Sequence, residues 1–474
     1  MQASRPRPPQ FSGTPFGMRL EPVWRECPPL ARLAMPLVLA MLGGIAINTT
    51  DMLMLGRVGP EALAAVSLAL SLFHPLMLLG VGIGLAVTPL VTEALSAYRS
   101  RQVRRSVRQG IWAAIPFTLL SVPPLWFSGT VFVWIGQNED LALAAQSYTR
   151  GVLPGLFFIL LLNVLRSYMT AVERTRAVLV VTLLAVPLNA ILNYFLIFGA
   201  GFIPPLGVWG AAIGSTLTNT AMGAGLAWHC IRARPFRRHA IFARFWRPDW
   251  TTFIALHRLG IPIGVMIVLE VAVFGASAQI MGLIGVLELA AHQITIQLAA
   301  ITFMVPLGIG QAATARVGLA AGRRDMERAT AAGWAAMALA TVFMGGAALA
   351  FWLIPESLVR PFLDDSGGAE AVLSLAVTYL AFAAGFQIVD GIQVTAAHAL
   401  RGLQDTRIPM WIAAFGYWGV TMPVAIWLGL HSSLEGRGVW LGLAGGLATC
   451  AVMLTWRFYR LTSKAAARVH AGRP

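Results

Sequence analysis

Charged side chains are scarce in this chain of 474 residues. They make up 12% of the sequence, whereas hydrophobic residues make up 57%, and soluble domains usually carry about 25% charged residues. No charged side chain occurs from Leu33 to Thr50, and the stretch from Ile263 to Leu287 holds only Glu270. A helix needs about 20 apolar residues to cross the ~30 Å core of a bilayer. The scarcity of charge therefore excludes an ordinary soluble domain and predicts an all-α polytopic membrane protein.

Cysteines and catalytic motifs are scarce as well. The three cysteines, Cys27, Cys230 and Cys450, lie far apart and form no CxxC pair. We therefore expect no disulfide framework and no cysteine metal site. The sequence contains no Walker phosphate loop, HExxH pair or GxSxG elbow. We therefore expect no enzyme activity and no bound cofactor. Without a nucleotide site, any transport would draw its energy from an ion gradient.

Positive charge, by contrast, is abundant and unevenly placed, with a formal net charge of +15. A basic soluble protein would suggest a nucleic-acid partner, but here the cations gather at alternate turns, as the positive-inside rule requires. No nucleic acid is therefore expected. The pattern predicts a bacterial inner-membrane protein with both termini in the cytoplasm. The basic clusters are Arg99, Arg101, Arg104, Arg105 and Arg108; Arg174 and Arg176; Arg232, Arg234, Arg237, Arg238, Arg244 and Arg247; Arg323, Arg324 and Arg328; and Arg457, Arg460, Lys464 and Arg468.

The apolar segments divide into two groups of six on either side of a basic linker. We expect a cytoplasmic arm at 1–30, a first lobe at 31–231, the linker at 232–256, a second lobe at 257–460 and a cytoplasmic tail at 461–474. Residues 1–30 lack the pattern of a cleavable signal peptide. The twelve predicted transmembrane spans are 33–56, 64–95, 110–135, 146–171, 178–201, 207–231, 257–284, 289–319, 332–354, 371–399, 408–430 and 438–459.

The two halves repeat one another. With a shift of 226 residues, Pro36 meets Pro262 and Gly82 meets Gly308; with a later shift of 231, Gly214 meets Gly445. Because each half contains six spans, both halves start on the same side of the membrane. The expected fold is thus two six-helix lobes related by a parallel pseudo-two-fold axis along the membrane normal, as in transporters with parallel repeats.

Three carboxylates, Asp51, Glu270 and Asp390, lie deep within apolar spans. A charge at that depth costs at least ~2.5–3.5 kcal/mol on insertion scales. The repeat places unlike residues opposite them: Ser277 opposite Asp51, Gly44 opposite Glu270, and Ile159 or Leu160 opposite Asp390. The scaffold can therefore be built without these acids, which favours proton or sodium binding. The alternative is a structural buried acid paired with a cation, for which Arg150 and Arg166 are candidates.

Polar side chains near the acids are expected to support a cation site. Gln387, Asp390 and Gln393 follow at three-residue steps and share a helix face. Amide oxygens suit a hard cation such as sodium and also accept a hydrogen bond from a carboxylic acid. Ordinary bonding between helices explains any single amide equally well. The same reasoning applies to two further amide pairs, Gln293 with Gln297 and Asn189 with Asn193.

Other candidates lie in the same spans. Phe386, one turn before Asp390, is expected to add an aromatic wall to the site. Three histidines are weaker candidates: His74, His292 and His398.

Six segments of the chain are distinctive when taken together: LAMPLVLAMLGGIAINTTDMLMLGRVG with Asp51, IPIGVMIVLEVAVFGASAQIMG with Glu270, LAAHQI, PLNAILNYFLIFG, GVWGAAIGSTLTN and GFQIVDGIQVTAAHALRGLQDTR with Asp390. Through these segments the chain resembles the multidrug and toxic compound extrusion (MATE) family, in particular its NorM type, over roughly residues 30 to 460.

The resemblance implies a V-shaped pair of six-helix lobes that alternates between inward- and outward-open states. It also implies export of organic cations against entry of sodium or protons. It implies a second-lobe cation site at Glu270 and Asp390, and a first-lobe site of Asp51 with Asn189, Asn193 and, in place of a family threonine, Ser215. Phe386 stands where some relatives have Tyr, so a hydroxyl is missing there.

The sequence therefore predicts a secondary multidrug antiporter for organic cation drugs and dyes, coupled to Na⁺ or H⁺. The residues expected to line the substrate cavity are Asp51, Phe386 and Asp390. We expect the protein to be a monomer surrounded by membrane lipid. The alternative is a flippase for lipid-linked precursors from the same superfamily, which would need cationic residues in its cavity to hold pyrophosphate. The charges identified within the spans are mostly acidic, which favours the antiporter.

Overall fold

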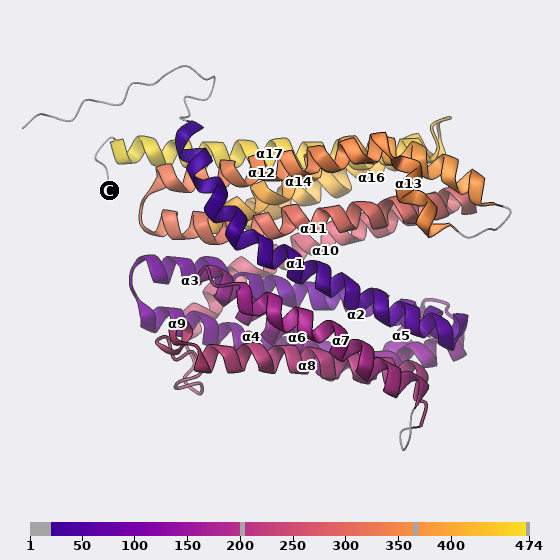
Figure 1. Ribbon diagram of the computed structural model, residues 1–474, viewed down its shortest axis with the longest axis horizontal. Coiled ribbons are helices and arrows are strands. Elements are labelled where there is room, and N and C mark those ends of the chain that lie inside the picture. Colours follow the sequence, from indigo (N-terminus) through magenta and orange to yellow (C-terminus); the bar gives the residue numbers. More distant parts are fainter. Residues whose placement is uncertain (1–19, 200–203, 364–367, 471–474) are drawn as a thin grey trace, which may run out of the picture.

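The structure, a computed structural model, describes residues 20–199, 204–363 and 368–470. Within these ranges every regular element is helical. Figure 1 shows the first half of the chain, indigo to magenta, and the last part, orange to yellow, as two layers of roughly parallel helices. Helix α1 (Leu20–Val58) runs obliquely from one layer to the other. This arrangement confirms the predicted all-α fold of two lobes.

The first lobe continues after α1 with seven helices: α2 (Pro60–Leu85), α3 (Val87–Ser96), α4 (Ser100–Trp126), α5 (Ser128–Trp134), α6 (Glu139–Ala171), α7 (Arg176–Phe198) and α8 (Gly207–Arg232). The short helix α9 (Arg234–Arg237) lies in the linker. The second lobe contains α10 (Trp250–Ile284), α11 (Val286–Gly322), α12 (Met326–Leu353), α13 (Pro355–Val359), the 3₁₀ turn η1 (Arg360–Phe362), α14 (Ala369–Gly402), α15 (Arg407–Ala414), the π-helical η2 (Phe415–Thr421), α16 (Met422–Leu430) and α17 (Gly436–His470).

Polar side chains fix several of the helix starts. The carboxylate of Asp249 accepts a hydrogen bond from the Thr252 backbone N–H at the start of α10, at 3.1 Å. Asp325 does the same for the Arg328 N–H at the start of α12, at 3.0 Å. Such caps satisfy backbone donors that have no partner within the helix.

Ten of the helical segments in the described ranges are long and apolar enough to cross a membrane, and the pair α4–α5, bent by 52°, adds an eleventh. Helix α8 has 26 residues, which at 1.5 Å per residue gives about 39 Å, and it packs against α6 and α7. Its polar side chains, Ser215 and Asn219 among them, lower its hydropathy. With α8 as the twelfth span, the helices match the twelve-helix prediction.

Several helices extend beyond the predicted spans. Helix α1 begins at Leu20 and so includes residues 20–30 of the expected arm; residues 1–19 lie outside the described ranges. The linker is shorter than predicted, because α8 ends at Arg232 and α10 already begins at Trp250. Helix α17 runs on to His470 through the predicted tail. These segments are amphipathic or charged, so a prediction based on hydropathy alone places the ends of the helices too early.

The repeat is visible as a pair of reciprocal contacts between the lobes. A Cβ atom on Gly82 of α2 would lie 2.2 Å from the backbone nitrogen of Gly264 on α10, and one on Gly308 of α11 would lie 2.5 Å from Cγ2 of Val38 on α1. The 226-residue shift carries Gly82 onto Gly308 and Val38 onto Gly264. Both contacts therefore join equivalent positions, and small residues let the backbones approach closely.

Ion pairs join the lobes at one end of the molecule. We call it the basic end, because it carries the Arg-rich turns after α3, α6 and α11 and the linker 233–249 (Figure 1). Arg316 of α11 pairs with Glu26 of α1 and with Glu173 in the turn after α6. Gln404 of the second lobe donates a hydrogen bond to Glu93 of α3, at 2.7 Å.

Candidate functional site

The first predicted site is assembled around Asp51. Asn193 of α7 donates a hydrogen bond to Oδ1 of Asp51 on α1, and Ser215 of α8 donates one to Oδ2, at 3.1 Å. Both oxygens of this carboxylate are thus hydrogen-bonded. Asn189, one turn before Asn193, is buried and lies near enough to interact with Asp51, but neither of its amide atoms has a partner at hydrogen-bonding distance among the described residues.

Two further residues shape this first site, and neither was predicted from the sequence to belong to it. Tyr148 of α6 is buried and interacts with both Asp51 and Ser215. Gly214 makes room for the neighbouring amide, because a Cβ atom there would lie 1.9 Å from Oδ1 of Asn193. Tyr148 gave no signal because it precedes the apolar part of its span, and Gly214 was recognised only as a repeat position.

The second predicted site centres on Asp390, which is 4% exposed. On the same face of α14, the amide nitrogen of Gln387 donates to Thr302 of α11, and that of Gln393 donates to the Tyr417 hydroxyl at 2.7 Å. Oε1 of Gln387, Oδ1 of Asp390 and Oε1 of Gln393 have no hydrogen-bond donor in the described part of the chain. A buried acceptor without a partner costs roughly 1–3 kcal/mol. A proton on the carboxyl group, or a cation, would supply what these oxygens lack.

Glu270 joins this second site from α10. It is partly buried and lies within electrostatic range of Asp390, Arg401 and Tyr417. The two predicted coupling acids therefore belong to one cluster, which four segments build: α10, α14, η2 and, through Cys450, α17.

Arg401 belongs to this cluster but was not among the residues predicted from the sequence. It is buried, at 6% exposed, and bonds to Nε2 of His398 at 3.1 Å. The predicted span ended at residue 399, so Arg401 was treated as part of a loop, whereas α14 runs to Gly402. The candidates Arg150 and Arg166 were wrong as partners for the acids: Arg150 donates to the backbone of Trp126 and Arg166 donates to Asn163.

Phe386 lies in an aromatic cluster inside the second lobe. Its ring packs edge-on against Phe274, with centroids 6.1 Å apart, and against Trp440, 5.7 Å apart. Trp440 in turn contacts His292, which is buried and whose ring nitrogens have no partner among the described residues. The interactions of Asp51 lie in the first lobe, whereas those of Phe386 and Asp390 lie in the second. The three predicted cavity residues therefore belong to different lobes.

Gln293 is exposed, unlike the buried residues of the Asp390 cluster. Gln293 and Gln297 are exposed on α11, and their repeat equivalents, Ser67 and Ser71, are exposed on α2. The two lobes therefore present matching polar pairs at the surface of corresponding helices.

Comparison with known proteins identifies relatives over most of the chain. The family model described as MatE matches residues 36–195 and 262–427. A probable multidrug resistance protein NorM from Mesorhizobium japonicum is 42% identical over 451 residues, covering 93% of this chain and 95% of that protein. One of the same name from Brucella suis biovar 1 is 42% identical over 443 residues, covering 92% and 93%.

The fold is similar to solved structures as well. A multidrug resistance MATE family transporter of the MOP superfamily, in an outward-facing conformation, superposes with a TM-score of 0.83 at 19% identity, covering 93% of this chain and 96% of that one.

Proposed function

Because the chain belongs to the MATE family and is a NorM-type member of it, we propose that it exports amphipathic organic cations in exchange for inward-moving sodium ions or protons. The family match and the relatives named NorM support a multidrug efflux transporter. The coupling ion and the exchange mechanism are our proposal. The observation that carries it is the contrast between the two acidic sites.

The contrast lies in how the two carboxylates are satisfied. Both oxygens of Asp51 accept hydrogen bonds from neighbouring side chains, whereas Oδ1 of Asp390 has no donor among the described residues. Amide oxygens without a donor lie beside both acids, so the difference is in the carboxylates themselves. The Asp390 carboxylate is therefore the one that gains most from a bound proton or cation. Amide and carboxylate oxygens are suitable ligands for sodium.

The charges of the second-lobe site indicate how many coupling ions it should bind. Glu270 and Asp390 supply two negative charges when both are ionised, and Arg401 supplies one positive charge within range of Glu270. One net negative charge remains in a region where charge is expensive. A single proton or sodium ion neutralises it, so we expect one monovalent ion at the second-lobe site in each transport cycle.

The way the lobes meet supports alternating access. In this proposal the lobes rock about the equivalent close contacts at Gly82 and Gly308, and the ion pairs at the basic end close that side. The exposed pairs Ser67–Ser71 and Gln293–Gln297 then line a polar path between the lobes. We propose that the basic end faces the cytoplasm of a bacterial inner membrane. The chain works as a monomer in this proposal, since it supplies every residue of both sites.

A ligand can shift the equilibrium between inward- and outward-open states only by binding one of them better. In our proposal, neutralisation of the Asp390 cluster by an entering ion changes which of the two states is favoured. An organic cation then displaces the ion in the other state.

A lipid-precursor flippase is less well supported. The buried cation nearest the site, Arg401, lies beside Glu270, which neutralises it before a pyrophosphate could.

The test is transport by purified protein in liposomes under a sodium gradient and, separately, under a proton gradient. We expect one of the two gradients to drive ethidium against its concentration. Failure of both gradients, with correctly inserted protein, would exclude the antiporter.

A further inference from the structure

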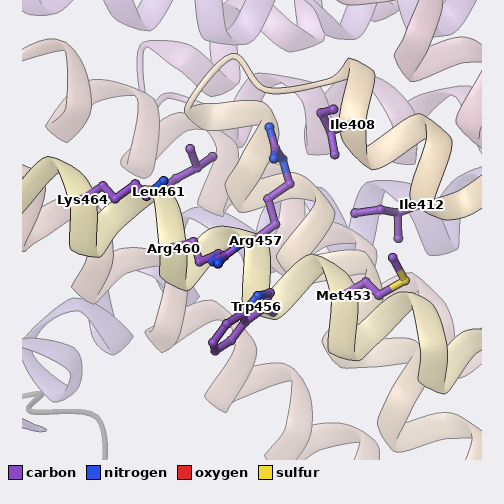
Figure 2. Close-up of a pocket in the computed structure, with 8 residues that line it drawn as sticks. All are labelled: Ile408, Ile412, Met453, Trp456, Arg457, Arg460, Leu461 and Lys464. Atoms are coloured by element: carbon purple, nitrogen blue, oxygen red, sulfur yellow. The ribbon is translucent and has the colours of Figure 1, made fainter.

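A groove lies on the second lobe between α15 and α17, and none of its lining residues is acidic. It encloses about 300 Å³, at the lower end of the range for small-molecule sites. One wall is a stripe of α17 side chains at spacings of three and four residues, which places Met453, Trp456 and Arg460 on a single helix face. Figure 2 shows Ile408 and Ile412 of α15 opposite this stripe.

The groove has an apolar part and a cationic part. Ile412 and Met453 lie toward one end, while Arg460, Leu461 and Lys464 lie toward the other (Figure 2). Helix α17 has its C-terminal part at the basic end, so the cations occupy the end nearest the proposed cytoplasmic surface (Figure 1).

The cations of the groove are not equally satisfied. Arg457 is paired with Asp405 at 2.5 Å. Arg460 lies over the ring of Trp456, 5.3 Å from its centroid, and neither Arg460 nor Lys464 forms a salt bridge with any residue in the described ranges. Two positive charges are therefore available to an anionic ligand. The aromatic ring beside them is a residue type that prefers the membrane interface.

The surface around the groove faces outward from the lobe. Trp411 on α15 is 66% exposed and Val452 on α17 is 69% exposed. In a membrane-spanning chain, large apolar side chains that are this exposed contact lipid. The occupant of the groove therefore comes from the bilayer.

We propose that this groove binds an anionic phospholipid from the cytoplasmic leaflet. Its phosphate group contacts Arg460 and Lys464, and part of one acyl chain follows the apolar wall past Leu461 to Met453. The order of charged and apolar groups along α17 matches the order along a phospholipid, from head group at the interface to chain in the core. The inference goes beyond the proposed transport activity and does not depend on the coupling ion.

The experiment counts lipids bound to the purified full-length protein by native mass spectrometry. The protein is titrated with phosphatidylglycerol, with phosphatidylcholine of the same acyl chains, and with inorganic phosphate. We expect specific binding of phosphatidylglycerol alone. If phosphatidylcholine binds equally well, or inorganic phosphate binds or competes at the same concentrations, an anionic phospholipid is not the occupant.

Two double variants separate this site from general surface charge. R460Q/K464Q should weaken phosphatidylglycerol binding about 30-fold, because a cation near an anionic lipid contributes about 1 kcal/mol and 1.4 kcal/mol is a factor of ten. R323Q/R324Q removes the same charge from an exposed turn of the same lobe and should leave this binding unchanged. Equal affinities in the two double variants would overturn the proposal.

The variant M453W tests the apolar part with all charges in place. Met453 is 38% exposed, so a larger ring can project into the groove without disturbing the core. We expect phosphatidylglycerol binding to fall at least several-fold. Binding equal to that of the unmodified protein would show that no acyl chain lies along this wall.

Discussion

Arg316 and Glu26 form a salt bridge between the two lobes, and their side chains are only 9% and 10% exposed. Both Nε and Nη2 of the arginine donate to Oε2 of Glu26, while Nη1 donates to Glu173 at 2.7 Å. Arg328 binds the remaining carboxylate oxygen of Glu26 at 2.8 Å. Any movement that opens the basic end must separate this network.

Arg316→Gln should therefore loosen the basic end. Removal of one partner of a buried pair leaves the other charge without compensation and typically costs about 3–5 kcal/mol. We expect faster hydrogen–deuterium exchange in residues 20–30 and in the turn after α6. Arg25→Gln is the matched control, since Arg25 and Glu21 are 77% and 73% exposed and such surface pairs contribute little. Equal exchange in the two variants would rule out a closing role for Arg316.

Asp390→Asn and Glu270→Gln should each abolish ion-driven transport while preserving membrane insertion. Either change leaves the cluster with one carboxylate and Arg401, so no net negative charge remains to bind a cation. The measurement is gradient-driven ethidium transport in liposomes. Glu356→Gln, a change in the same lobe at a side chain that is 65% exposed, serves as the control. Full coupled activity in both acid variants would return Glu270 and Asp390 to a structural role.

The acids and the repeat could be predicted from the sequence because their signals are strong and local. A carboxylate in an apolar run is visible without any structure, and so are glycines at a constant shift. The repeat even extends to hydrogen bonds: Thr88 donates to the backbone oxygen of Ser167, and its equivalent Thr314 donates to that of His398. The 226-residue shift relates the two threonines and the 231-residue shift relates Ser167 to His398, but the contact of each threonine with its acceptor follows from helix packing.

Arg401 and Tyr417 could not be predicted because their roles depend on distance in space. Arg401 lies at the charged end of a span, where hydropathy cannot distinguish a buried cation from a loop cation. Tyr417 lies in the π-helical η2, whose wider turn changes the direction of side chains relative to an ordinary helix. The exposure of Gln293 was equally hidden from the sequence, because an isolated amide in an apolar span does not reveal which way its helix face points.

The local stability of the linker should depend on pH because of His239. Its Nδ1 lies 2.6 Å from the Tyr168 hydroxyl, and burial, with Arg238 and Arg104 nearby, lowers the pKa of His239 from 6.5 to about 4. The folded-state pKa is below the unfolded value, so the stabilisation by neutral His239 is complete above pH 6.5 and is lost as the pH falls toward 4. Hydrogen–deuterium exchange of residues 233–249 should rise over this interval. His239→Gln should remove this dependence; an unchanged pH profile would exclude His239 as its source.

Gly214 and Gly445 occupy equivalent positions of the repeat but have different surroundings. A Cβ atom on Gly214 would lie 1.9 Å from Oδ1 of Asn193, whereas one on Gly445 would meet nothing within 4 Å. The same substitution therefore tests the first-lobe site at one position and serves as its own control at the other.

Gly214→Ala should displace the Asn193 amide and with it the hydrogen bond to Asp51, because the helix backbone of α8 cannot retreat without losing its packing on α7. We expect a loss of at least about 1–3 kcal/mol of stability, the cost of leaving a buried polar group without its partner, together with reduced transport. Gly445→Ala should be neutral or should stabilise by up to about 1 kcal/mol, since alanine is the better helix former. Thermal unfolding and ethidium transport measured on both variants decide the matter: if Gly214→Ala is as well tolerated as Gly445→Ala, then the close approach of α8 to Asn193 does not hold the Asp51 site together.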